Sequence, residues 1–138
     1  MFKISAQEVI DAAKICRKFI PENQLETMSR NMRNRDEGDW FRSKFLELAA
    51  LVLTMPKTYE QDGLGDQSIA YLHYFSGDSD WYIIEKDMED EQHQAFGYAD
   101  AGYGELGYIS LVELCKHPSV ELDLHWTPKP LSQIRQAA

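Results

Sequence analysis

Carboxylates and histidines in aromatic-rich stretches are the side chains of this sequence best suited to chemistry. Glu121, Asp123 and His125 alternate along one predicted strand, so successive members lie about 6.5–7 Å apart on one face. Two such side chains can reach one metal ion, and His73 would add a ligand if its strand were adjacent. The polar outer face of an amphipathic strand explains the alternation without a metal. We therefore predict no metal site and retain only His73, Asp123 and His125 as candidate ligands.

Two further carboxylates lie beside aromatic residues. Glu85 follows the run WYII, and Glu105 precedes LGY. Carboxylates in such surroundings can act as general acids, and a pair of them suits hydrolysis of a glycosidic bond. Glu85, Glu105 and Asp123 are thus the catalytic candidates of a small hydrolase. Each is explained more simply as a rim carboxylate or a hydrogen-bond acceptor. The sequence contains no GxSxG motif, and neither cysteine has a nearby motif histidine, so we expect binding rather than catalysis.

Charge is divided unevenly along the chain. Residues 1–55 carry a net charge of +1 and residues 56–138 a net charge of −10, within a total of −9. An acidic surface repels nucleic acid and membranes and is attracted to basic clefts, although it also serves solubility alone. The candidate binding residues are the acids of two predicted loops: Asp78, Asp80, Asp87, Glu89, Asp90 and Glu91. The small basic cluster of Arg30, Arg33 and Arg35 fits either a solvated helix face or an anion contact.

The stretch Ser68–Lys86 must position most of these residues. It reads as two aromatic-rich strands joined by a turn, with Gly77 and Asp78 supplying the turn chemistry. Neither strand has a clean polar face, so both faces are expected to be largely covered. In this view the hairpin is the scaffold that presents the acidic loops on either side of it.

Helical patterns dominate the first part of the chain and strand patterns the second. Ser5 and Glu8 form a capping box that opens the first helix, and Pro21 ends it. Gly97 is expected to mark a bulge or a close approach of backbones. We expect helices over residues 5–20, 22–34, 40–55 and 110–117, further strands over 95–99, 105–109 and 120–126, and one helical turn over 131–134. The pattern predicts an α+β fold, with N-terminal helices packed on a mainly antiparallel sheet of about five strands.

Length and composition are typical of one folded domain. The chain has 138 residues, and 43% of them are hydrophobic. We expect a single domain with a helical part (1–55) and an acidic, sheet-rich part (56–138). No apolar run reaches the ~18 residues that a membrane span needs, and the N-terminus lacks the order of a signal peptide. Cys16 and Cys115 are not in a CxxC motif, so we expect reduced thiols and a cytoplasmic location.

Several short motifs follow one another in the second part of the chain. They read P-K-x-Y, Y-x-H-Y-F, W-Y-I-x-E, F-G-Y, E-L-G-Y-I-S-L-x-E-L and E-L-D-L-H-W-x-P, at Pro56–Tyr59, Tyr71–Phe75, Trp81–Glu85, Phe96–Tyr98, Glu105–Leu114 and Glu121–Pro128. This series, over roughly residues 51–138, resembles a domain family of unknown function carried by bacterial plasmids, integrating elements and phages. Leu122 departs from the pattern, because an arginine is expected there and any arginine–carboxylate pair at that position is missing.

The resemblance implies a bacterial mobile-element setting and an α+β fold on an antiparallel sheet, but no established activity. Together with the charge, it predicts a cytoplasmic binding protein that docks on a basic, nucleic-acid-handling host protein. Inhibition of CRISPR interference or of restriction is the most concrete form of that prediction. We expect no cofactor, no direct contact with nucleic acid and no membrane. The alternatives are the hydrolase described above and a structural module that self-associates through its second helix.

Overall fold

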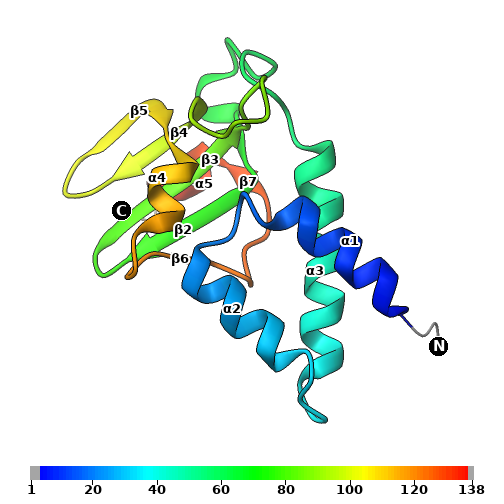
Figure 1. Cartoon of the computed structure of the whole chain (residues 1–138). Helices are drawn as coiled ribbons and strands as arrows, with labels where there is room; N and C mark the ends of the chain where they lie inside the picture. Colours follow the sequence, from blue (N-terminus) through cyan, green and yellow to red (C-terminus); the bar gives the residue numbers. More distant parts are fainter. Residues whose placement is uncertain (1–3, 137–138) are drawn as a thin grey trace.

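The structure, a computed structural model, describes residues 4–136 and consists of a helical layer packed on a mainly antiparallel sheet (Figure 1). Three helices come first in the chain: α1 (Ala6–Cys16), α2 (Glu22–Asn31) and α3 (Gly38–Thr54). Two short helices follow later, α4 (Leu111–Lys116) and α5 (Leu131–Gln136). A 3₁₀ turn, η1 (Gly65–Gln67), comes after α3 and before the first strand along the chain. The α+β fold expected from the sequence is confirmed.

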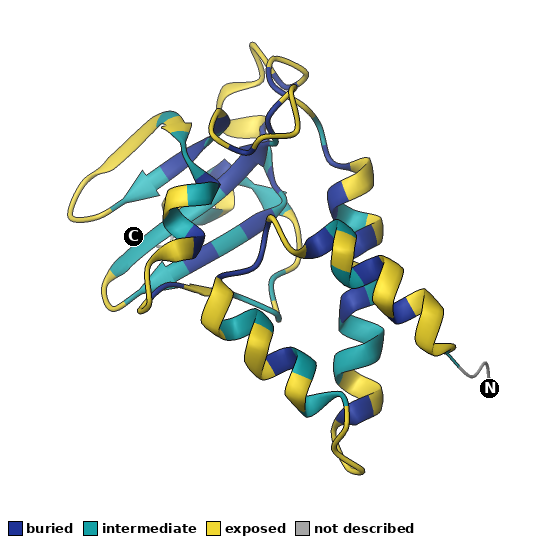
Figure 2. Cartoon of the chain, in the orientation of Figure 1, coloured by how far each residue is buried: buried dark blue, intermediate teal, exposed yellow. Residues whose placement is uncertain are grey.

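The first helix shows how local sequence signals place the N-terminal layer. The Ser5 hydroxyl accepts a hydrogen bond from the Glu8 N–H, and the Glu8 carboxylate accepts one from the Ser5 N–H, so the predicted capping box is present. The helix buries Val9, Ala12 and Cys16 against α3 and the sheet. Figure 2 shows this inward burial as dark bands on helices whose outer faces are exposed.

The main sheet has five strands in the order β5-β4-β3-β2-β6, and every neighbouring pair is antiparallel. Its strands are β2 (Leu72–Ser76), β3 (Ser79–Glu85), β4 (Ala95–Asp100), β5 (Gly104–Ile109) and β6 (Glu121–Leu122). A separate two-stranded pair joins β1 (Ile69–Ala70) to β7 (Lys129–Pro130). The β2–β3 hairpin is therefore central, as expected, with β4 on one side of it and β6 on the other.

The two faces of the sheet bury different groups. On the helix face, Leu72, Tyr74 and Ile83 are fully buried in the core against the N-terminal helices. The Tyr74 hydroxyl donates a hydrogen bond to the Phe19 carbonyl, which links the sheet to the segment after α1. The opposite face, here called the aromatic face, carries side chains that alternate with the core positions, among them His73, Tyr82, Phe96, Tyr98, Leu106 and Tyr108.

The C-terminal segment covers part of the aromatic face. The Trp126 ring lies 5.1 Å from the ring centre of His73 and 5.5 Å from that of Tyr82. Leu131 of α5 is fully buried against Ile84 and Tyr98. The far part of this face, over β4 and β5, is not covered in the same way, and Leu106 and Tyr108 are 40% and 52% exposed. The two hairpin strands, whose faces were expected to be largely covered, therefore lie under the covered part of the sheet, whereas the β5 edge is open.

A break in register shapes β3 and its neighbour. The pairing shifts between Ile83 and Glu85, which places Glu85 opposite Phe96 on the aromatic face. Gly97 of β4 lies at the same level, and a Cβ atom there would overlap the carbonyl oxygen of Tyr82. The sequence-based expectation of a close backbone approach at Gly97 is confirmed.

The strand predicted over residues 120–126 is wrong beyond its first residues. Only Glu121 and Leu122 pair in the sheet, and the Asp123 N–H still reaches the His73 carbonyl at 2.8 Å. The Asp123 carboxylate then accepts the N–H of His125 at 2.9 Å, which closes a local turn. Trp126 consequently packs on the aromatic face and not beside the buried Leu122, although alternation along one strand would place both residues on the same face.

Both cysteines are free and buried, as reduced thiols would be. Burial raises the pKa of Cys16 to about 12 and that of Cys115 to about 12, so neither thiol ionises readily. Within residues 4–136, no helix has the length and apolar character needed to cross a membrane.

Candidate functional site

A histidine held by two aspartates is the most connected polar group on the sheet. His73 Nε2 lies 2.7 Å from an Asp80 carboxylate oxygen, and Nδ1 lies 3.0 Å from one of Asp123. The imidazole stacks on Tyr82 with ring centres 4.7 Å apart and planes 8° apart. Both ring nitrogens therefore have acceptors, and the ring bridges β2, β3 and the turn after β6. Burial, followed by the charges of Asp80 and Asp100, raises the pKa of Tyr82 to about 12.

This arrangement does not bring the three candidate metal ligands together. His73 and Asp123 are neighbours, as the sequence suggested, but His73 contacts Asp80 and Asp123, and the second Asp123 oxygen accepts the His125 N–H. The His125 ring lies elsewhere, 5.6 Å from the ring centre of Trp40. Among the residues the structure describes, no group of three or more His, Cys, Asp or Glu side chains is placed to hold a metal ion.

The three candidate catalytic carboxylates do not converge. Glu105 lies on β5 and Asp123 follows β6, at opposite edges of the five-stranded sheet and so roughly 19 Å apart at the usual strand spacing. Glu85 lies between them and is only 4% exposed. Its two carboxylate oxygens accept the backbone N–H groups of Tyr59 at 3.0 Å and Gln61 at 2.7 Å. Glu85 thus anchors the loop over residues 57–68, and the three candidates do not provide the pair of carboxylates that glycoside hydrolysis needs.

The predicted acidic binding residues fall into two groups. Asp78, Glu89 and Glu91 are exposed, as expected. Asp80 is bound to His73, and Asp90 forms an exposed ion pair with Lys18 at 3.4 Å.

Asp87 requires a correction, because its carboxylate is not solvated. The residue is 5% exposed, and its oxygens accept the N–H groups of Glu89, His93 and Gln94. Desolvation raises the pKa of Asp87, but these three hydrogen bonds together outweigh it and leave the pKa below its ordinary value. Asp87 is an internal acceptor that shapes the loop between β3 and β4, so it is not part of a binding surface.

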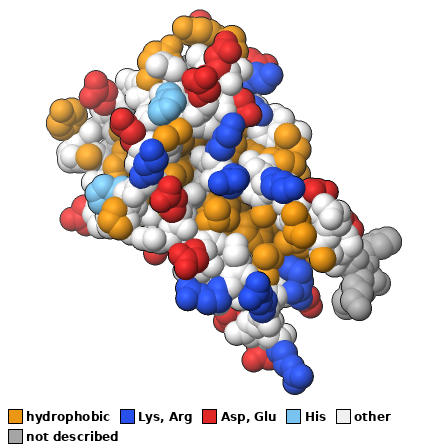
Figure 3. Space-filling model, in the orientation of Figure 1, with side chains coloured by type: hydrophobic (Ala, Val, Ile, Leu, Met, Phe, Trp, Pro, Cys, Tyr) orange, Lys and Arg blue, Asp and Glu red, His pale blue; other side chains and the backbone are white. Residues whose placement is uncertain are grey.

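Most other carboxylates of the sheet-rich part lack a basic partner. Nine of them form no ion pair with any residue between 4 and 136: Glu60, Asp62, Asp78, Glu89, Glu91, Asp100, Glu105, Glu113 and Glu121. We call these the unpaired acids. They lie in loops, turns and strand ends around the sheet, except Glu113, which lies in α4. Figure 3 shows acidic side chains over the sheet and its loops, while many Lys and Arg side chains gather over the helices. Arg30, Arg33 and Arg35 are exposed at the end of α2 and just after it.

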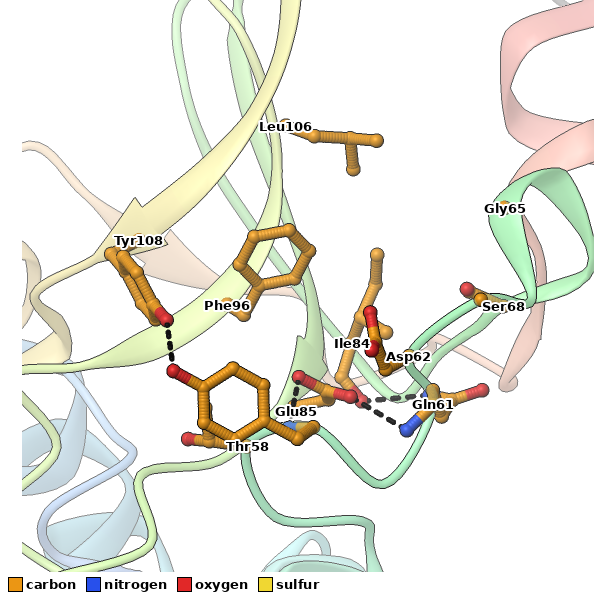
Figure 4. Close-up of a pocket in the computed structure, with 12 residues that line it drawn as sticks. Thr58, Gln61, Asp62, Gly65, Ser68, Ile84, Glu85, Phe96, Leu106 and Tyr108 are labelled. Atoms are coloured by element: carbon orange, nitrogen blue, oxygen red, sulfur yellow. Dashed lines mark hydrogen bonds between the residues drawn. The ribbon is translucent and has the colours of Figure 1, made fainter.

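A pocket opens on the aromatic face beside β5 (Figure 4). It has a volume of about 220 Å³ and lies between the loop over residues 57–68 and strands β3 to β5. We call it the β5 pocket, and its principal lining residues are Tyr59, Asp62, Ser68, Phe96, Leu106 and Tyr108. The Asp62 carboxylate and the Ser68 hydroxyl lie on the loop side, across the hollow from Phe96 and Leu106. One side of the pocket is thus apolar and the other polar and acidic.

Tyr59 forms an end of this pocket in a strained conformation. Its φ angle is +76°, a region that bulky side chains rarely adopt. The Glu85 carboxylate holds its backbone N–H, and its hydroxyl lies 3.2 Å from that of Tyr108. That hydrogen bond is the principal cause of the raised pKa of Tyr108. Strained residues of this kind cluster at sites that hold ligands.

Sequence reasoning missed the β5 pocket. The stretch around Asp62 has the composition of an ordinary exposed loop, and the pattern of residues 105–109 predicts only a short strand. One signal was available, because β5 reads GELGYI and contains two glycines and one charge, which is typical of an edge strand. The loop lies beside that edge because the Glu85 carboxylate holds it there. This tertiary contact leaves no pattern in the local sequence.

No protein-family model matches this chain, and neither the curated proteins nor the solved structures include a significant match.

Proposed function

We propose that this protein is an acidic binding protein that docks on a basic, nucleic-acid-handling host protein and inhibits it. The observation that carries the proposal is the set of nine unpaired acids around the sheet. Carboxylates without internal partners project a negative potential, which steers association with a basic surface and determines which partners are rejected. A basic cleft that normally holds phosphates is the natural complement of such a surface.

The biological setting of the proposal rests on the motif series of residues 51–138. Its resemblance to a family carried by plasmids, integrating elements and phages favours a target among host defence proteins. CRISPR effectors and restriction enzymes bind DNA or RNA through basic channels, so an acidic protein lodged in such a channel would exclude the nucleic acid. We therefore propose anti-CRISPR or anti-restriction activity.

The alternatives are less well supported by the geometry. The hydrolase needs convergent carboxylates, but Glu105 and Asp123 lie at opposite edges of the sheet and Glu85 holds a loop. Self-association through the second helix needs a free apolar stripe. Met28 of α2 is buried in the core, and Leu25 of α2 and Met32, just after the helix, pack against that core.

Capture from a bacterial lysate tests the proposal. Immobilised protein is exposed to nuclease-treated lysate at about 0.05 M salt and eluted at about 0.5 M salt, where charges are screened within a few ångströms. We expect the eluate to contain a nucleic-acid-binding protein that duplex DNA or RNA also displaces from the immobilised protein. Adding the acidic protein back to this partner should block its cleavage or binding of nucleic acid. Capture that is indifferent to salt and to nucleic acid would contradict the proposal.

A further inference from the structure

We propose that the outer edge of β5 binds an extended, basic segment of the partner as a sixth strand, and that the β5 pocket receives an arginine or lysine side chain from it. This inference rests on the proposed function, because it names where on the acidic protein the basic partner docks. It goes further, since it specifies the backbone geometry of the bound segment and the side chain that is recognised.

The first argument is the free edge of the sheet. β5 ends the strand order, and no strand between residues 4 and 136 pairs with its outer side. Its residues are exposed over most of its length. Natural proteins protect such edges with lysines, prolines, bulges or a covering element. Here β5 has one charge, Glu105, and two glycines, and it presents the apolar side chains of Leu106 and Tyr108. An edge of this kind accepts an added strand through main-chain hydrogen bonds.

The second argument is the size and chemistry of the β5 pocket. Its volume of about 220 Å³ is below the ~300–1,000 Å³ typical of small-molecule sites, so it suits one side chain. Phe96, Leu106 and Tyr108 provide an apolar wall for an aliphatic stem. Across the hollow (Figure 4), the Asp62 carboxylate forms no ion pair with any residue between 4 and 136. Long basic side chains pack their stems on apolar surface and keep the charged head near a carboxylate.

The third argument is the position of the pocket relative to the edge. Leu106 and Tyr108 belong both to β5 and to the pocket wall, so a strand added beside them projects alternate side chains over the pocket. Tyr59 bridges the loop to Tyr108 and closes one end. The Glu85 carboxylate holds the loop through two backbone N–H groups, so the pocket is formed before any partner arrives.

Charge decides between a basic segment and a second copy of this chain. The protein carries a net charge of −9, and Asp62 and Glu105 lie beside the edge without basic partners. Pairing two β5 edges would bring like charges together, which opposes association. A segment that carries lysine and arginine is instead attracted to these carboxylates.

A capped peptide, Lys-Thr-Val-Arg-Val-Thr-Lys, is a direct probe of the full-length protein. We expect its titration to shift the NMR signals of the β5 amides and of the loop over residues 57–68. Replacing the arginine of the peptide with citrulline keeps the shape and removes the charge, and should weaken binding about tenfold, as loss of a charged hydrogen-bonded contact does. Equal binding of the two peptides would overturn the assignment of the pocket.

Peptide N-methylation tests strand addition itself. In an added edge strand, the N–H groups of alternate residues point to β5 and the others to solvent. Methylating one alternate set should abolish binding, while methylating the other set should leave the affinity nearly unchanged. If both methylated peptides bind like the parent, or both fail to bind, the segment does not pair with the edge.

A matched pair of protein variants completes the test. Asp62→Asn and Glu105→Gln each remove one charge beside β5, but Glu105 lies opposite Ala99 and points to the other face of the sheet. We expect Asp62→Asn to weaken binding of the arginine peptide several-fold more than Glu105→Gln does. Asp62→Asn should leave the affinity for the citrulline peptide unchanged. Equal effects would contradict the inference. If a basic partner is captured as proposed above but the β5 edge binds no peptide, this inference fails while the proposed function stands.

Discussion

At the scale of single residues, His73 explains why Asp80, a predicted binding acid, and Asp123, a catalytic and metal-ligand candidate, are not free. The His73 ring lies between Asp80 and Asp123, with one ring nitrogen within hydrogen-bond distance of each carboxylate. The imidazole ties the turn after β6 to the hairpin. The group has a structural role on the sheet, and the unpaired acids remain for a partner.

Replacing His73 with leucine is expected to lower the free energy of unfolding by about 1–3 kcal/mol, because two half-buried carboxylates lose their shared donor. Adding Asp80→Asn and Asp123→Asn to His73→Leu should recover part of the loss. Urea denaturation measures both changes. His125→Gln, at an exposed ring, is the control and should change stability by less than about 0.5 kcal/mol. A His73→Leu variant as stable as wild type would show that the bridge is dispensable.

Asp87 makes a prediction about pH. Its folded-state pKa is below the ordinary value, so its contribution to stability is complete above about pH 4, where the unfolded carboxyl ionises, and declines as the pH falls through the folded pKa. Asp87→Asn should therefore destabilise the protein near neutrality, and the difference from wild type should shrink below about pH 4. Denaturation curves across this range provide the measurement. A difference that is constant with pH would contradict the role assigned to the three N–H groups.

Asp87 also shows where residue-level sequence reasoning ends. It lies in a run of acids, DMEDE, that is typical of a solvated loop, and its neighbours Glu89 and Glu91 are indeed exposed. Asp87 differs from these neighbours because three backbone N–H groups donate hydrogen bonds to its carboxylate. Local composition holds no information about which acid of a run becomes the internal acceptor.

At the scale of elements, the close approach of β3 and β4 is a feature on which the sheet depends. Gly97 has no space for a Cβ atom because the Tyr82 carbonyl occupies it, whereas a Cβ on Gly107, its partner on β5, would meet open space. Gly97→Ala should lower the free energy of unfolding by about 1–3 kcal/mol through overpacking. Gly107→Ala, the matched control, should be neutral or slightly stabilising. Equal effects in thermal or urea unfolding would refute this view of β4.

Elements with strong local signals were predictable, and those defined by tertiary pairing were not. The Ser5–Glu8 capping box, the Gly77 turn and the breaks at Pro21 and Pro56 predicted three helices and the hairpin. The predicted first hairpin strand is divided instead, because Ile69 and Ala70 pair with β7. The alternation after Val120 indicated a long strand, yet the carboxylate of Asp123 caps a turn that ends it.

At the scale of the whole molecule, uncompensated charge should act against the folded state. The unpaired acids repel one another, and salt screens that repulsion. The free energy of unfolding is expected to rise as sodium chloride increases from about 0.05 to about 0.5 M. A variant with Asp78→Asn, Glu89→Gln and Glu91→Gln should show a smaller rise. Stability that is unchanged or lower at high salt would mean that these carboxylates do not dominate the surface potential.

The same triple variant gives the most direct test of the central claim, that the acids of the sheet-rich part bind a basic partner. Its affinity for the captured host protein is compared with that of Glu26→Gln, Asp36→Asn, Glu37→Gln, a variant that removes three exposed charges from the helical part. At about 0.1 M salt we predict at least a roughly tenfold loss for the sheet variant and little change for the helix variant. Equal losses for both variants, or none for either, would contradict the account.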